Sequence, residues 1–253
     1  LGIYRSSEVV GTLSLSSIDT KSDWNGNVSK DDKSKLSFDN FSYVGYFPTA
    51  NESGIMSWNI GLSYNRLKNF NRNYRLSGSQ AYSLADYAAD ISYGIPENDL
   101  IYVKDSYDPY NNPNNPWMSV LGYEAGYFGS FLNDRSSYHS GFGTSNATGD
   151  IWYADSPQNT TLNVSEKGAV DQYNFAFATN ISNSVFLGAT IAVTDINYSI
   201  SSIYDERFEG GDYLYLDNGL TTEGTGYSFN LGAIVRPVDF LRMGVAYNSP
   251  TWY

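Results

Sequence analysis

The sequence contains no cysteine, a single histidine and no motif typical of an enzyme. The absence of cysteine excludes disulfides, thiolate catalysis and cysteine-based metal sites. A Ser-His-Asp site would have to use His139, which lies in a Ser/Tyr/Gly-rich stretch, and no Gly-x-Ser-x-Gly pattern surrounds any serine. A phosphate loop and a dinucleotide fingerprint are also missing. We therefore predict that the protein is not an enzyme and has no catalytic residue, cofactor or metal ligand.

Basic side chains and long apolar runs are scarce as well. Fifteen Lys and Arg stand against 27 Asp and Glu, and the net charge is -12. Phosphate binding needs clustered Lys and Arg, so nucleic acid is not an expected partner. No apolar run reaches about 18 residues, which excludes a transmembrane helix. An N-terminal signal peptide is not recognisable, and the sequence begins at Leu1, so we interpret it as mature or truncated.

Aromatic residues, by contrast, are abundant at 16%, and 23 of them are tyrosine. Tyrosine has one apolar and one polar end, which suits a membrane interface. The 23 glycines, together with many Asn and Ser, are typical of strands and turns rather than of a helical bundle.

Several segments alternate strictly between large apolar and small or polar residues. The clearest is 57–65, and the pattern recurs in 173–178, 185–194, 227–236 and 241–248. In a strand the two sets face opposite sides. The second row holds Gly, Ala, Ser and Asn with almost no Lys or Glu, which favours a barrel lumen on that side and lipid on the other. A soluble β-sandwich is the alternative.

This pattern predicts which side chains face lipid and which face the lumen. The residues expected to face lipid are Trp58, Ile60, Leu62, Phe229, Leu231, Val245 and Tyr247. The residues expected to face the lumen are Asn59, Gly61, Asn230, Gly232 and Gly244.

The fold class predicted is all-β, an antiparallel transmembrane β-barrel with short helices in a long extracellular loop. The expected strands are 8–24, 35–48, 56–75, 170–181, 185–204, 223–236 and 240–253. Tight turns are expected at 180–183 and 236–239, and long loops at 25–34, 77–168 and 205–222. Single-chain bacterial barrels have even strand numbers. Seven strands therefore indicate that residues 1–253 form one partial outer-membrane barrel domain, with 77–168 inserted as an extracellular loop.

The 77–168 insertion is too long for a plain connection. Helices are expected over 83–91, with Ser83 as N-cap, and over 116–132, with Pro116 at the first position. The second segment carries an apolar stripe that could bind an apolar ligand or pack the loop onto itself. The stripe consists of Trp117, Met118, Leu121, Phe128, Phe131 and Leu132.

Two further features concern loops and strand ends. The acidic residues Asp205, Glu206, Glu209 and Asp212 could form a calcium site, but their spacing differs from an EF-hand, and a solvated loop tip is the favoured interpretation.

In the third strand the apolar row breaks. Arg66 takes the next outward position, while Leu67 and Phe70 are out of phase. A bulge near Asn65, Arg66 and Leu67 would reconcile the halves and open the wall sideways. Alternatively, the strand has left the bilayer by Arg66.

Three stretches resemble the OmpP1/FadL family of outer-membrane transporters, especially its Bacteroidetes branch often labelled "hemin receptor". Residues 1–8 resemble the family's entry from the luminal hatch into the first strand, 60–72 its third-strand block and 242–253 the block ending its seventh strand. The resemblance implies a barrel of about fourteen strands, within the even-numbered bacterial range.

It also implies uptake of hydrophobic molecules such as long-chain fatty acids. Capture by apolar extracellular loops would be followed by passive diffusion and lateral exit at Asn65, Arg66, Leu67 and Phe70. The expected partners are outer-membrane lipid, the apolar ligand and other outer-membrane proteins, in a Gram-negative bacterium. The hatch and its Asn-Pro-Ala motif are missing, and a single loop histidine supports haem ligation poorly. A structural barrel whose large loop contacts another surface protein is the alternative function.

Overall fold

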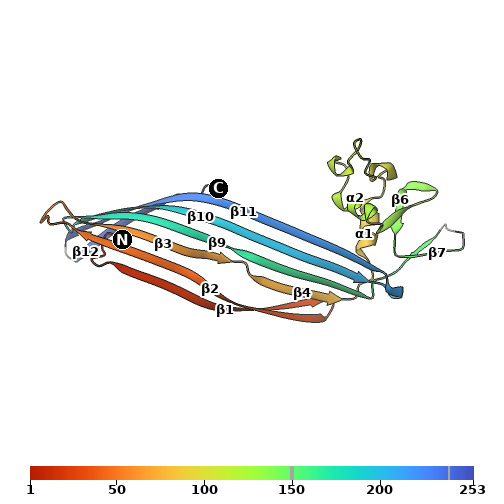
Figure 1. Cartoon of the computed structure of the whole chain (residues 1–253), viewed down its shortest axis with the longest axis horizontal. Coiled ribbons are helices and arrows are strands. Elements are labelled where there is room, and N and C mark those ends of the chain that lie inside the picture. The colour runs from red at the N-terminus through yellow and green to blue at the C-terminus, as the bar shows by residue number, and fades with distance from the viewer. Residues whose placement is uncertain (149–150, 239) are drawn as a thin grey trace.

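The computed structural model describes residues 1–148, 151–238 and 240–253. Its main feature is one long, curled antiparallel sheet in the order β1-β2-β3-β9-β10-β11-β12, with β4 beside β9 (Figure 1). The strands of this sheet are β1 (Glu8–Trp24), β2 (Asn27–Pro48), β3 (Ile55–Asn69), β4 (Arg72–Gly78), β9 (Asn159–Ile181), β10 (Val185–Arg207), β11 (Tyr213–Val238) and β12 (Leu241–Asn248). The prediction of an all-β antiparallel fold is confirmed. No helix within the described residues is long and apolar enough to cross a membrane.

The seven predicted strands match seven side-by-side positions in this antiparallel sheet, which we call tracks. Two strands in succession, β3 and β4, fill the third track. Strand boundaries agree within a few residues at the end that carries the tight turns. The 180–183 turn is confirmed, with Ser182 and Asn183 at φ 51° and 55°. The 236–239 turn includes Asp239, which lies outside the described residues.

At the opposite end two predicted loops were wrong, because the strands simply continue. Trp24 pairs with Asn27 across a two-residue Asn25-Gly26 turn with φ 51° and 87°. Both central residues thus have the positive φ of the Asn-Gly hairpin turn. Likewise β10 runs to Arg207 and β11 starts at Tyr213, so most of 205–222 is strand. The insertion between β4 and β9 is therefore 79–158 rather than 77–168.

The two faces of the sheet differ as the alternation predicts. Outward side chains such as Phe175, Phe177 and Ile191 are 52–60% exposed, whereas Ala178 and Ala192 on the inner face are 1% exposed. In β3 likewise, Asn59 is buried and its neighbour Ile60 is exposed. The exposed apolar row on β10 runs from Val185 to Val193. That is about nine residues, the length needed to cross a bilayer at a tilt.

Beyond this apolar band the polarity of the two faces is exchanged. On the side of the later end of β10, the apolar band ends at one row of residues that are in register across four strands. This row consists of Tyr64, Tyr173, Val193 and Tyr227. Further along β10 the outward residues are Asp195 and Asn197, and the inward residues are Ile196 and Tyr198. Along this part of β10 the outer face is therefore polar and the inner face apolar, the reverse of the arrangement within the band.

The insertion forms a small compact unit, here called the end module, beyond the tips of β10 and β11 (Figure 1). Its elements are α1 (Leu84–Ile91), η1 (Glu97–Asp99), η2 (Pro109–Asn111), α2 (Trp117–Glu124), β5 (Phe128–Phe131), β6 (Asp134–Ser140), β7 (Gly143–Ser145) and β8 (Trp152–Ala154). Ser83 caps α1 as predicted, and Asp86 completes a capping box. The second predicted helix is shorter than 116–132, since the chain turns into β5 after Glu124.

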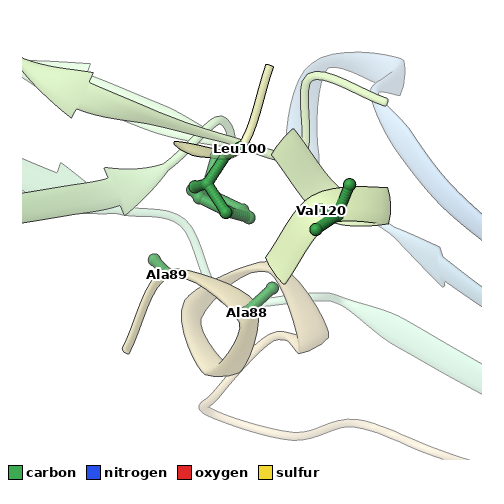
Figure 2. Close-up of a cluster of buried hydrophobic side chains, with 5 residues drawn as sticks. Ala88, Ala89, Leu100 and Val120 are labelled. Atoms are coloured by element: carbon green, nitrogen blue, oxygen red, sulfur yellow. The ribbon is translucent and has the colours of Figure 1, made fainter. Parts of the chain in front are cut away.

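Two buried clusters hold the end module together and fix it to the sheet. Figure 2 shows Ala88 and Ala89 of α1 on one side, with Leu100 and Val120 opposite them, and Phe128 completes this first cluster. The second cluster joins Ala85 of α1 to Phe208 and Leu214 at the tips of β10 and β11. The insertion is therefore packed both within itself and against the sheet.

Replacing Leu100 with alanine should loosen the end module without disturbing the sheet. Leu100 is fully buried, and truncation of such a leucine costs about 2–5 kcal/mol. Its neighbour Ile101 is 39% exposed, so Ile101→Ala is the matched control and should be nearly neutral. Limited proteolysis of the folded protein provides the measurement. Equal cleavage of both variants within 80–165 would contradict the role of this cluster.

A candidate ligand site on the inner face

The candidate site lies where the third track of the sheet breaks. The register between β3 and β9 shifts between Arg66 and Lys68, so Leu67 is an extra residue and is 54% exposed. β3 ends at Asn69 and β4 resumes at Arg72, again beside β9. The predicted irregularity near 65–67 is therefore confirmed as a β-bulge.

On the side away from β9, β3 loses its pairing with the neighbouring strand β2. The ladder between β2 and β3 ends at the pair Asn40 and Asn65, and among the described strands residues 27–39 of β2 pair with β1 alone. β2 also bulges here, since Thr12 pairs with Asn40 and Leu13 with Phe38, leaving Asp39 extra. The bulges at Asp39 and Leu67 thus lie just beyond the last pair of the β2–β3 ladder, Asn40 and Asn65. From this point on the β1–β2 hairpin and β4 are separate, and we call it the fork.

Side chains satisfy the backbone at the end of the ladder. The Asn40 amide donates to the Tyr64 carbonyl at 3.3 Å and to the Asn65 side chain. On the outer face Arg66 forms a bidentate pair with Asp171, with distances of 2.9 and 3.2 Å. Tyr64 donates to the same carboxylate at 2.9 Å. Arg66 is therefore neutralised at the boundary of the apolar band, which explains how a cation continues an apolar row.

A cavity of about 580 Å³ lies on the inner face against the break. Its apolar lining comes from Ile18, Phe70, Ile196 and Tyr198, and the Phe70 and Tyr198 rings meet edge to face at 4.9 Å. Its cations are Lys68 and Arg72.

The charges of this cavity are only partly compensated. Arg72 is paired with Glu166 at 2.6 Å, whereas Lys68 forms no ion pair with any described residue. Apolar walls with a free ammonium group suit an amphiphile with an anionic head. Of the four residues predicted for a lateral exit, Asn65 and Arg66 form the fork, Leu67 is the bulge and Phe70 lines the cavity.

The predicted ligand-binding stripe in the end module does not form one surface. Phe128 is 3% exposed within the first cluster, and Met118 packs against it. Leu121 is half-buried, and Phe131 contacts the His139 ring at 4.9 Å. Trp117 and Leu132 are exposed at 56% and 86%. Self-packing thus explains Phe128 and Met118, and two of the six side chains, Trp117 and Leu132, are exposed by more than half.

The acidic stretch at the tips of β10 and β11 is also divided. Glu206 is fully buried and accepts hydrogen bonds from Gln80 (2.7 Å), Ser83 (2.5 Å), Tyr204 (2.6 Å) and the Leu84 backbone (3.0 Å). Asp205 instead pairs with Arg207 at 2.8 Å. The predicted solvated loop tip was therefore wrong for Glu206, which anchors α1. In the described part of the chain, no group of three His, Cys, Asp or Glu could hold a metal ion.

Burial and hydrogen bonds shift the pKa values of several ionisable side chains in the end module. Burial, followed by the hydrogen bond to Glu97, raises the pKa of Tyr123 to about 12. The Tyr123 hydroxyl in turn lowers the pKa of Glu97, with Ser130 and Arg135 adding to the effect. Burial, opposed by the Ser83 backbone and reinforced by Glu206, raises the pKa of Asp86. Each of these groups holds a turn or helix in place.

The fold and site together define a curled antiparallel half-barrel with an amphiphilic inner cavity beside a gap in its strand pairing. No family model, curated protein sequence or solved structure matches the chain.

Proposed function

We propose that this chain is part of an outer-membrane β-barrel of a Gram-negative bacterium that takes up hydrophobic small molecules such as long-chain fatty acids. The observation that carries the proposal is the amphiphilic cavity beside the fork. Its place next to a stretch without strand pairing suits a ligand that leaves sideways into the bilayer. The resemblance to the OmpP1/FadL family supports the same function.

The outer face supports a membrane location. A continuous band of large apolar side chains is exposed across β3, β9, β10, β11 and β12, far beyond what soluble monomers leave in water. The band would be covered by lipid in a bilayer. β1 and β12 are the outermost strands of the described sheet, and in a bilayer we expect further strands to pair with them, because unpaired backbone is costly in hydrocarbon.

The exchange of polarity beyond the band supports a route for the ligand. Ile196, Tyr198 and Ile200 face inward there, and the inner residue Leu214 contacts the end module. An acyl chain entering near the end module would reach the cavity past Ile200 and Tyr198 of β10. Its head group would meet Lys68, and the fork would then release the tail toward lipid.

A second candidate function is contact with another surface protein. It is favoured by the exposure of Trp117 and Leu132 on the end module. Aromatic side chains exposed in this way are typical of interface cores. Substituting both with serine should leave fatty-acid binding intact and abolish association if this function applies.

Replacing Ile196 with aspartate should reduce fatty-acid binding at least tenfold. The new carboxylate would lie in the cavity, where it removes apolar contact and repels an anionic head group. Ile203 lies on the outer face of the same strand, so Ile203→Asp is the control and should bind normally. Binding and uptake of oleate are measured with the full-length protein in lipid vesicles. Equal affinity of both variants, or no oleate binding by the unmodified protein, would contradict the proposal.

A further inference from the structure

Beyond the fork the β1–β2 hairpin meets β4 again, but without strand pairing between the described residues. Asn73 of β4 is the centre of this contact. Its backbone carbonyl accepts a hydrogen bond from the Thr20 hydroxyl at 2.9 Å, and its side-chain oxygen accepts one from the Lys33 ammonium at 2.9 Å. Ser165 of β9 donates to the same side-chain oxygen at 3.1 Å. Asn73 therefore ties the hairpin to both β4 and β9.

Between the fork and Asn73 the wall has no ladder. Residues 34–39 of β2 and 66–72 of the third track lie in this stretch, and no strand pairing joins them. Farther out, Asn25 donates to the Ser79 carbonyl at 3.4 Å, and Trp24 lies against Gly78. Side-chain hydrogen bonds near solvent are individually weak, so this end of the hairpin can move more readily than a paired strand.

Movement of the hairpin would also change the cavity. Ile18 lines the cavity opposite Phe70, and Ile18 is the register partner of Lys33. A displacement of Lys33 away from Asn73 would thus carry Ile18 away from Phe70. The contact at Asn73 and the width of the cavity at the break are mechanically linked.

We propose that Asn73 is a positioning residue that sets the width of the side opening by holding the β1–β2 hairpin against β4. This inference rests on the proposed function, since it concerns which ligands pass. It predicts that loss of the Asn73 oxygen admits wider ligands, while a substitution that keeps an oxygen at this position does not.

The test compares Asn73→Ala with Asn73→Asp, which retains an acceptor for Lys33 and Ser165. Spin labels on cysteines placed at Leu36 and Leu67, both exposed and on opposite sides of the unpaired stretch, report its width. The chain has no native cysteine to interfere. We expect a longer and broader distance distribution for the alanine variant and the unmodified distribution for the aspartate variant. Asn163→Ala, on an exposed position of β9, should change nothing.

Transport selectivity is the second readout. Uptake of a fatty acid carrying a pyrene ring should rise several-fold in Asn73→Ala relative to oleate and stay unchanged in Asn73→Asp. Unchanged distances and selectivity in the alanine variant, or an aspartate variant that behaves like alanine, would overturn the inference. If the labels respond but no protein, modified or not, binds oleate, the proposed function fails while the role of Asn73 in positioning the hairpin stands.

Discussion

Replacing Leu231 with arginine should destabilise the protein in a bilayer by about 2–4 kcal/mol. Leu231 is 50% exposed on the outer face of β11, in the middle of the apolar band. In register it lies beside Ala189 of β10 and Tyr247 of β12, and neither can neutralise a guanidinium group. If lipid covers this face, the introduced guanidinium group must either lie in the hydrocarbon or distort the strand to reach the membrane interface.

Thr221→Arg provides the matched control, because Thr221 is an exposed outward residue of the same strand beyond the band. Its arginine should be nearly neutral. Equilibrium unfolding by denaturant in lipid vesicles gives the difference between the two. Equal stability of both variants would place the apolar band outside the membrane. So would labelling of a cysteine at 231 from the aqueous lumen when a cysteine at 230 is protected.

Replacing Glu206 with alanine should release the end module from the sheet. The substitution leaves Gln80, Ser83, Tyr204 and the Leu84 backbone without their common acceptor inside a buried site. Hydrogen bonds to a charged group are worth about 1.5–3 kcal/mol each, and donors left unsatisfied cost a similar amount. We expect α1 to lose roughly 3 kcal/mol of local stability, with the long strands unaffected.

Hydrogen exchange resolved along the chain measures this effect directly. Exchange of the α1 amides should accelerate by about two orders of magnitude, as 1.4 kcal/mol corresponds to a factor of ten. Asp195→Ala is the control, since Asp195 is an exposed carboxylate of the same strand. Glu206→Gln should fall between the two because it keeps one acceptor oxygen. Unchanged protection of α1 in Glu206→Ala would show that the buried cluster around Ala85 and Phe208 suffices as an anchor.

Leu231→Arg and Glu206→Ala test two separate parts of the same sheet. The apolar band around Leu231 faces outward, whereas Glu206 closes the end of the inner, apolar part of the sheet. The cavity beside the fork lies between these regions along β10, lined by Ile196 and Tyr198.

The sequence by itself determined the features that depend on neighbouring residues. Period-two alternation located five of the seven tracks, those of β3, β9, β10, β11 and β12, and separated Ile60 and Phe177 from Asn59 and Ala178. The Ser83 N-cap and the 182–183 turn follow from local side-chain and backbone chemistry. The phase change at Arg66 and Leu67 marked the bulge, because a single extra residue must shift every following side chain to the other face.

Only the tertiary structure decided the features that join distant segments. The loops expected at 25–34 and 205–222 are mostly strand because they pair residue by residue with a neighbouring strand, 27–34 with β1 and 213–222 with β10. The fork exists because the pairing of β2 with β3 stops at Asn40, and no local pattern records where a distant strand ends. Glu206 is buried because α1, some 122 residues earlier in the chain, folds over it. Local propensity specifies each strand, but the contacts between remote strands decide which polar groups are enclosed and where the wall stays unpaired.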